Sequence, residues 1–170
     1  LCRELKQKGW HVRIETNGFY ADALERILPV VSEVALDVKT ELDADKYAKL
    51  TGFRGEPATL MQETLRSIVI MRNAKQKTPG LIVELRTTVI PQVNDSEEVI
   101  EKIAKEAAFA DKYALQQFSA EGPLIDPAYE RYGNARKQSL IDLAQAALAF
   151  CGNVVIRTQE EGEQKVEKGG

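Results

Sequence analysis

The sequence predicts an α/β fold built on a parallel sheet, in the form of an incomplete βα barrel. Segments with the two-residue alternation of strands take turns along the chain with longer segments of helical periodicity. Right-handed crossovers between such strands leave two arrangements, an open doubly wound sheet or part of a βα barrel. No strand is followed by the glycine pattern of a dinucleotide or P-loop site, and the strands are fewer than the eight of a closed barrel. An open or incomplete barrel therefore fits best.

The first half of the chain begins with a helical pattern that Gly9 ends, and Asn17-Gly18 then marks the turn after the first strand. Asp22 and Glu25 have the spacing of a capping box at the start of the next helix. We expect strands at residues 11–16 and 34–38, and helices at residues 1–8, 22–29, within 40–52 and at 57–75. The buried stripe of the longest helix should comprise Leu60, Thr64, Leu65, Ile68, Val69 and Met71.

The second half continues the alternation of strands and helices. Pro79-Gly80 forms a turn, and Asp95 with Glu98 suits a capping box. We expect strands at residues 81–90, 113–118 and 154–158, helices from about residue 95 to 107 and at 136–150, and a loop at 121–133. Residues 1–158 are then one domain, the incomplete barrel, and residues 159–170 a charged tail.

The composition excludes several classes of protein. The chain has 170 residues, of which 44% are hydrophobic and 29% charged, and a net charge of −3. The charges are well mixed, so we expect neither a nucleic-acid nor a membrane partner. Without a signal peptide or an apolar run of ~18 residues, a cytoplasmic location is expected. Cys2 and Cys151 are too far apart in sequence for a spaced metal motif. Because Leu1 lies inside a helical pattern, we interpret the sequence as part of a longer protein.

Polar side chains alternate with apolar ones along the expected strands. Glu15 opposes Ile14, Asp37 and Lys39 oppose the valines and leucine of their strand, and Arg86 opposes Leu85. If helices cover the apolar faces, the polar faces bring together Glu15, Asp37, Lys39, Arg86 and Gln116. Burying one unpaired charge costs several kcal/mol, so this set needs water, mutual pairing or a polar ligand. Periodicity alone leaves a site and a merely solvated face about equally favoured.

Five short segments in order resemble those of radical S-adenosylmethionine activating enzymes. Glu15-Thr16-Asn17-Gly18 resembles the turn after a strand in that family, and Leu36-Asp37-Val38-Lys39 resembles its Asp-x-Lys motif. The segments at residues 47–52, 85–95 and 116–118 follow in the expected order. The likeness covers nearly the whole chain and is greatest to activators of glycyl-radical enzymes, of the pyruvate formate-lyase or anaerobic ribonucleotide reductase type. The ending at residues 155–163 is more similar to the ribonucleotide reductase type.

The resemblance implies a partial barrel of six parallel βα units, here its third to sixth strands plus a C-terminal strand. It also implies two cofactors in the full-length protein, S-adenosylmethionine and a [4Fe–4S] cluster held by a Cys-x-x-x-Cys-x-x-Cys loop. In the family, reductive cleavage gives a 5′-deoxyadenosyl radical, which abstracts a hydrogen atom from a glycine of the partner enzyme.

The chain departs from the family pattern in three places. It has no Cys-x-x-x-Cys-x-x-Cys and no Gly-Gly-Glu segment, and Gln92 stands where the family usually has Gly after Pro91. We therefore expect this chain alone to bind no cluster and to be inactive, as the C-terminal part of such an enzyme. The alternative is a degenerate, non-catalytic family member that binds a protein or a small anion. The coding sequence upstream of Leu1 would discriminate between the two.

The resemblance gives each site residue an expected role. Lys39 and Arg86 are expected to bind the methionine carboxylate, since a guanidinium can hold a carboxylate in a fork. Asp37 and Glu15 would balance those cations or bind a monovalent cation. Thr16 and Asn17 lie at a turn close to the ligand, and Gln116 would contact ribose or adenine. The structural alternatives are a buried ion pair of Arg86 with Asp37 or Glu84, and solvated side chains for the others.

The same partial barrel leaves the edge at residues 11–16 open. Exposed strand edges invite pairing with another chain. We therefore expect a possible homodimer through this edge, with Trp10 at the contact.

Overall fold

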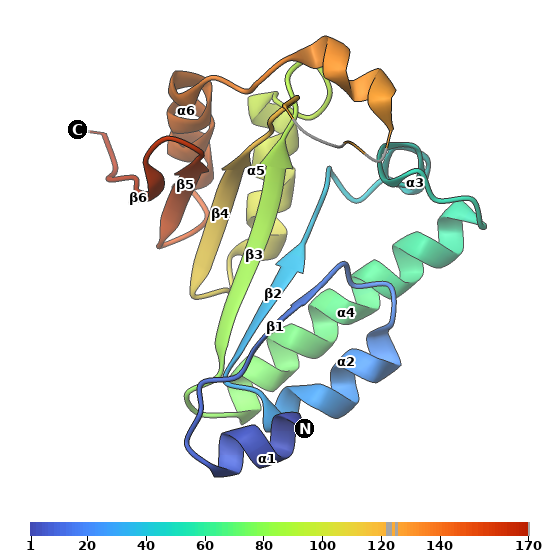
Figure 1. Ribbon diagram of the computed structural model, residues 1–170, viewed down its shortest axis with the longest axis vertical. Helices are drawn as coiled ribbons and strands as arrows, with labels where there is room; N and C mark the ends of the chain where they lie inside the picture. The colour runs from blue at the N-terminus through green and yellow to red at the C-terminus, as the bar shows by residue number, and fades with distance from the viewer. Residues whose placement is uncertain (122–123, 125, 170) are drawn as a thin grey trace.

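Six strands form a single sheet in which spatial order equals chain order (Figure 1). In the computed structural model, which describes residues 1–121, 124 and 126–169, the strands are β1 (Arg13–Thr16), β2 (Glu33–Asp37), β3 (Ile82–Val89), β4 (Lys112–Gln117), β5 (Val154–Thr158) and β6 (Gly162–Lys165). Strands β1 to β5 are parallel, and β6 is antiparallel to β5. A doubly wound sheet would reverse its strand order, so this is the winding of a βα barrel. The predicted α/β class and open parallel barrel are confirmed.

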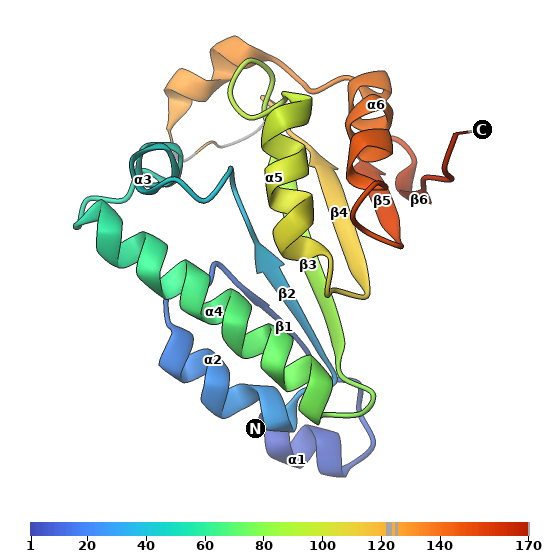
Figure 2. The same ribbon diagram turned by 180° about the vertical axis from the view of Figure 1, so that it is seen from behind.

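Helices cover one face of the sheet and leave the other face open, as the two opposite views show (Figures 1 and 2). The helices are α1 (Cys2–Gln7), α2 (Ala21–Ile27), α3 (Ala44–Thr51), α4 (Pro57–Lys77), α5 (Glu97–Ala107) and α6 (Lys137–Ala147), with short 3-10 turns η1 (Leu28–Val30) and η2 (Pro127–Tyr132). The hydrophobic core lies between this helical layer and the sheet. Its burial supplies the main stabilisation of the fold.

The register of the strands separates the two faces of the sheet. Val34 pairs with Val83 and Leu36 with Leu85, and these four side chains are completely buried in the core. The residues between them, Ala35 with Glu84 and Asp37 with Arg86, pair on the open face. Because side chains alternate along a strand, a one-residue slip would place the charges in the core. The predicted alternation of apolar and polar faces is thus present in the structure.

Both predicted capping boxes are wrong. Helix α2 has Tyr20 at its N-cap position without a side-chain cap, and Glu63 on α4 accepts from the Ala21 N–H at 3.1 Å instead. Helix α5 is capped by Ser96, whose Oγ accepts from the Val99 N–H at 3.3 Å. The predicted N-cap residues, Asp22 and Asp95, lie within two residues of the observed N-cap positions. A tertiary contact at α2 and the backbone conformation at α5 determine which side chain accepts from the first turn.

The stripe predicted for α4 is partly wrong. Leu60, Thr64, Ile68 and Met71 are buried, whereas Leu65 and Val69 are 41% and 49% exposed. The remaining buried positions are Met61 and Ser67. Successive helical residues are rotated by ~100°, so Leu65 and Val69 lie one step beyond the face that contacts the sheet.

The last segment contains a strand where only a charged tail was expected. Strand β6 pairs Glu163 with Arg157 and Gln164 with Ile156 of β5. Gly162, the first residue of β6, has a φ of +69, which suits the tight turn between β5 and β6. In the expected loop at residues 121–133 the structure has η2, while positions 122, 123 and 125 of that loop, and position 170 of the tail, lie outside the described residues.

Candidate functional site

Four of the predicted site residues form one connected cluster of charges at the carboxyl ends of β1 and β2 and beside them on β3. The Arg86 guanidinium donates to Asp37 Oδ1 and to Glu15 Oε1, both at 2.7 Å. The Lys39 ammonium donates to Asp37 Oδ2 at 3.0 Å. Parallel strands end at the same edge of a sheet, which is why residues distant in sequence meet here. We call Glu15, Asp37, Lys39 and Arg86 the strand-end cluster.

Two buried side chains hold the backbone that carries Asp37 and Lys39. The Tyr47 hydroxyl donates to the Asp37 carbonyl at 3.2 Å and accepts from the Lys39 N–H at 3.3 Å. The Asn94 amide donates to the Lys39 carbonyl at 2.6 Å and to the Thr88 carbonyl at 2.9 Å. Both residues are 1% exposed, and burial raises the pKa of Tyr47 to about 12. These contacts explain why segments 47–52 and 85–95 accompany the Asp-x-Lys motif.

The electrostatics favour the charged forms of Glu15 and Arg86. The hydrogen bond from Arg86 lowers the pKa of Glu15. Burial opposes the charge on Arg86, but hydrogen bonds with Glu15 and Asp37 raise its pKa overall. The Arg86 side chain is only 10% exposed, whereas that of Lys39 is 33% exposed. A half-open cation beside a buried one, both balanced by carboxylates, is suited to receive a small anion.

The polar side chains of the turn after β1 form hydrogen bonds within the turn itself. Thr16 Oγ1 accepts from the Gly18 N–H at 3.0 Å, and Asn17 Oδ1 accepts from the Phe19 N–H at 3.1 Å. Gly18 has φ +79, and a Cβ there would lie 2.9 Å from Leu36 Cδ1. The glycine is therefore required by conformation and packing. Thr16 and Asn17 border the strand-end cluster without joining it.

Gln116 lies apart from the strand-end cluster. It is half-buried on β4, paired with Thr88 and with Arg157. Among the described residues, no hydrogen bond joins its amide to Arg86 or Asp37. The structure thus brings together four of the seven predicted site residues.

A second group of charges, which the sequence analysis did not identify, lies on the open face of the sheet and extends from β1 to β6. Its centre is Glu84, which is completely buried on β3. Arg157 donates to both Glu84 oxygens at 2.8 Å, Arg13 donates at 3.1 Å, and the Lys112 ammonium lies at 3.2 Å. Glu33 pairs with Arg13, and Glu163 pairs with Lys112 and Arg157. We call these six residues the sheet-floor network.

The two groups are linked through Arg13, whose guanidinium also donates to Glu15 at 3.3 Å. Burial works against the charge of Glu84, but hydrogen bonds from Arg157 and Lys112 hold its pKa at about 2. The signal that could have revealed this network is the presence of opposite charges two residues apart within single strands, Arg13 and Glu15 on β1 and Glu84 and Arg86 on β3. Its pairing also shows how a charged face of an open sheet avoids unpaired charges.

The donor set available for a metal is small. The chain has two cysteines, and both are free thiols, with Cys2 on α1 and Cys151 buried after α6. Burial raises the pKa of the Cys151 thiol to about 11, so it is unsuited to act as a thiolate ligand. Across the described ranges 1–121, 124 and 126–169, no three His, Cys, Asp or Glu side chains are grouped as metal ligands. These residues therefore do not fit a cluster that needs three thiolates.

Known structures share this fold. The chain superimposes on a domain of the pyruvate-formate lyase-activating enzyme from Bacteroides vulgatus with a TM-score of 0.63 and 13% identity, covering 92% of this chain and 87% of that one. It superimposes on a radical SAM methyltransferase from Sphaerobacter thermophilus with a TM-score of 0.64 and 16% identity, covering 88% of this chain and 42% of that one. The open, sequentially wound sheet is therefore a partial barrel like those of the radical SAM enzymes.

Curated sequence relatives of the chain carry names of activating enzymes. It is 32% identical over 160 residues to a protein of Methanocaldococcus jannaschii whose name assigns it to the glycyl-radical enzyme activating enzymes, covering 93% of this chain and 63% of that protein. It is 35% identical over 106 residues to the isethionate sulfite-lyase activating enzyme of Oleidesulfovibrio alaskensis, covering 62% of this chain and 31% of that protein. No protein-family model matches the chain.

The chain is thus similar in sequence to proteins named as glycyl-radical enzyme activating enzymes, and this confirms the resemblance seen in the motifs. The chain spans less than two thirds of the length of these curated relatives. Among the described residues, no helix combines the length and apolar character needed to cross a membrane.

Proposed function

We propose that this chain supplies the S-adenosylmethionine-binding face of an activating enzyme that generates a glycyl radical on a partner enzyme. The observation that carries the proposal is the strand-end cluster, in which Arg86 and Lys39 converge on Asp37 at the carboxyl ends of parallel strands. This is the end of βα barrels at which ligands bind. Relatives named as activating enzymes support the same function.

The donor chemistry of the strand-end cluster fits the methionine part of the ligand. Lys39 and Arg86 would bind and orient its carboxylate, with the guanidinium able to donate from two nitrogens. Asp37 and Glu15 keep both cations in place before the ligand binds, which reduces the ordering required on binding. When bound and reduced by one electron from the iron–sulfur cluster of the whole protein, the ligand would supply the radical chemistry that removes a hydrogen atom from a glycine of the partner.

We propose no residue of this chain as a ligand of the iron–sulfur cluster. Two cysteines cannot provide the three thiolates that the family uses, so the cluster ligands would belong to another part of the whole protein. We propose accordingly that this chain by itself is inactive and that its contribution is to ligand binding. Which glycyl-radical enzyme is the partner would be decided outside the strand-end cluster.

The proposal predicts that Lys39→Gln and Arg86→Gln weaken binding of S-adenosylmethionine about tenfold to a hundredfold, the range of one charge-assisted hydrogen bond. Isothermal titration with S-adenosylmethionine and with its decarboxylated analogue measures this effect. The analogue lacks the carboxylate, so its affinity should be low for the unmodified chain and unchanged in both variants.

Lys102→Gln is the matched control, because Lys102 pairs with Glu98 on α5, away from the strand-end cluster. Circular dichroism confirms folding of Arg86→Gln, which leaves two carboxylates without their partner. Lys39→Gln removes a more exposed cation and is the variant least expected to disturb the fold. If the unmodified chain bound S-adenosylmethionine and its decarboxylated analogue equally well, the strand-end cluster would not recognise the carboxylate.

A further inference from the structure

The segment that carries Asp37 and Lys39 extends beyond the part of the sheet that β1 covers. The last residue pair between β1 and β2 joins Thr16 to Leu36, and β2 ends one residue later. In a parallel sheet, the Asp37 carbonyl and the Lys39 N–H would both bond to one residue of a neighbouring strand. Within the described residues β1 supplies no such residue, so these two backbone groups need another partner.

The Tyr47 hydroxyl takes the place of that strand residue. It donates to the Asp37 carbonyl at 3.2 Å and accepts from the Lys39 N–H at 3.3 Å, the two bonds that a parallel strand would make here. Its ring comes from α3 and lies in the hydrophobic core, with 1% of the residue exposed. A hydroxyl on a tightly packed ring has little freedom to move, so it fixes the spacing between Asp37 and Lys39.

The remaining backbone groups of the segment bond to β3 and to the loop that follows it. The Val38 N–H donates to the Arg86 carbonyl, and the Val38 carbonyl accepts from the buried Thr87 hydroxyl, both at 2.8 Å. The Asn94 amide donates to the Lys39 carbonyl at 2.6 Å. The whole segment therefore has a fixed position relative to Arg86, the second cation of the strand-end cluster.

The loop after β3 is folded so that Asn94 reaches Lys39. Asn94 Oδ1 accepts from the Ile90 N–H at 2.7 Å, which closes a tight turn. Within this turn Gln92 has a φ of +63, the one positive φ of a non-glycine residue among those described. Such a conformation is unfavourable for a residue with a long side chain and persists only where the surrounding structure determines it. We infer that the turn accepts this strain because it returns Asn94 to the Lys39 carbonyl.

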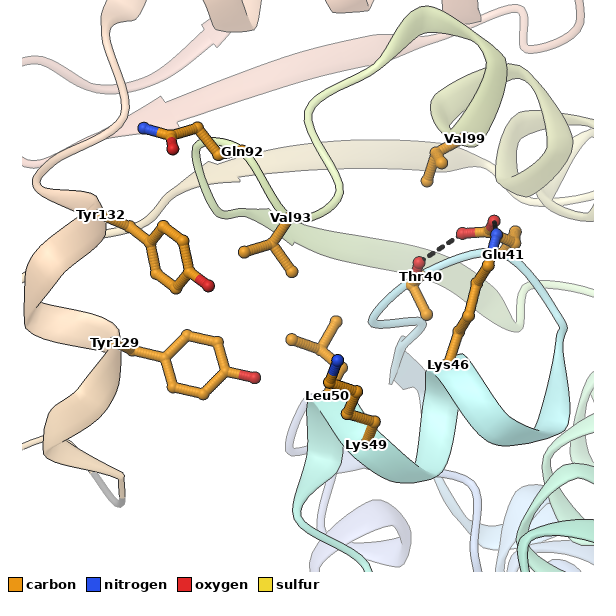
Figure 3. Close-up of a pocket in the computed structure, with 10 residues that line it drawn as sticks. All are labelled: Thr40, Glu41, Lys46, Lys49, Leu50, Gln92, Val93, Val99, Tyr129 and Tyr132. Carbon is orange, nitrogen blue, oxygen red and sulfur yellow. Dashed lines mark hydrogen bonds and ion pairs between the residues drawn. The ribbon is translucent and has the colours of Figure 1, made fainter.

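Open space beyond the segment makes these hydrogen bonds necessary. A cavity of about 330 Å³ begins where the segment ends, and its lining includes Thr40 and Glu41, which follow Lys39 (Figure 3). The Thr40 hydroxyl donates to Glu41 at 2.6 Å, so it holds the next residue of the loop. Atoms that face a cavity have no packing partners on that side. The position of Lys39 therefore depends on the hydrogen bonds of Tyr47 and Asn94.

We propose that Tyr47 and Asn94 are positioning residues, which set the affinity of the strand-end cluster for a carboxylate by fixing the N–H and the carbonyl of Lys39. A lysine ammonium lies at the end of a flexible stem, so its place beside Asp37 depends on where the backbone holds its Cα. The inference rests on the proposed function and adds to it two buried residues from outside the strand-end cluster.

The first test is Tyr47→Phe, which keeps the buried ring and removes only the hydroxyl. It should weaken binding of S-adenosylmethionine about fivefold or more, measured by isothermal titration, and leave binding of the decarboxylated analogue unchanged. Cys151→Ala is the matched control, because it also removes a buried hydrogen bond, from Cys151 Sγ to the Ala104 carbonyl at 3.3 Å. The control should lower the melting temperature without changing the affinity. If Tyr47 were only structural, both variants would give this result.

A double-mutant cycle tests whether the effect acts through Lys39. In the Lys39→Gln background, Tyr47→Phe should weaken binding of S-adenosylmethionine by less than about twofold, because the ammonium that it positions is gone. Asn94→Asp keeps the acceptor for the Ile90 N–H and loses the donor to the Lys39 carbonyl, so it should show the same dependence. Equal losses of affinity in the two backgrounds would overturn the inference.

Amide hydrogen exchange tests the geometry without any ligand. In Tyr47→Phe the Lys39 N–H loses its acceptor and should exchange about tenfold faster or more. The Val38 N–H, which donates to the Arg86 carbonyl, should keep its rate. An unchanged rate at Lys39 would show that the hydroxyl does not hold this backbone, and the inference would be wrong.

The binding results separate this inference from the proposed function. If Lys39→Gln weakens binding of S-adenosylmethionine while Tyr47→Phe and Asn94→Asp do not, the proposed function stands and the positioning role is wrong. If the unmodified chain binds S-adenosylmethionine and its decarboxylated analogue equally well, both the proposed function and this inference are wrong, whatever the exchange rates.

Discussion

At the scale of single residues, Glu84 is the buried carboxylate to which the cations of the sheet-floor network bind. A buried carboxylate is unfavourable by itself, but Arg13, Lys112 and Arg157 surround this one within 3.2 Å. Removing Glu84 would leave its three cations with Glu33 and Glu163 as their remaining partners in the sheet-floor network. The network therefore makes the open face of the sheet sensitive to single substitutions.

Glu84→Gln is expected to lower the free energy of unfolding by about 3 to 5 kcal/mol, because it leaves three cations around a neutral amide. Urea denaturation monitored by circular dichroism measures the change. Glu98→Gln is the control, since Glu98 forms an exposed pair with Lys102 and should cost less than about 1 kcal/mol.

The pH dependence gives a second readout of the same residue. The pKa of Glu84 is lowered from its ordinary 4.5 to about 2, so the charged form is stabilised in the folded state. That contribution is complete above pH ~4.5 and is lost as the pH falls toward 2, because the unfolded chain then binds the proton first. Glu84→Gln should flatten this acidic limb of the stability curve; an unchanged limb would contradict the assignment.

At the scale of elements, the sequence pattern located the α-helices and the five parallel strands but not the caps of α2 and α5. The strand at Val154–Thr158 has the expected bounds, and α4 ends two residues beyond the expected position. Cap assignment failed at α5 because Asp95 and Ser96 are neighbours, and both residue types cap helices well. Backbone conformation at Ser96, with φ −94 and ψ 147, decides which side chain reaches the first turn.

Ser96→Ala should therefore lower the free energy of unfolding by about 1 kcal/mol, the usual value of an N-cap hydrogen bond. Asp95→Ala should change it by less than about 0.5 kcal/mol. Thermal and urea unfolding of the two variants measure the difference. A larger loss for Asp95→Ala would show that the capping assignment in the structure is wrong.

At the scale of the whole molecule, the described sheet is open at both edges. Strand β1 is one edge and β6 is the other. Strand β6 is short and rich in charge, which discourages pairing with another strand. Strand β1 follows Trp10, whose side chain is 65% exposed, so this edge combines free backbone groups with an exposed aromatic ring.

We predict that this chain self-associates through the β1 edge. Sedimentation velocity should show dimer increasing with concentration over the micromolar range, and Trp10→Glu should weaken the association. Leu65→Glu, which changes an exposed residue on the opposite helical layer, should leave it unaffected. A chain that stays monomeric at high concentration would exclude this mode of association.

The sequence by itself determined the α/β class, the alternation of faces along the strands and the resemblance to activating enzymes, because these depend on local periodicity and on short motifs. It also selected Glu15, Asp37, Lys39 and Arg86, since their alternation marks one face of neighbouring strands. Only the tertiary structure decided which charges pair, as with Glu84 and Arg157, which are 73 residues apart. It likewise placed Gln92 and Tyr129 around one cavity. Such contacts depend on register and loop conformation, and no local pattern in the chain encodes either one.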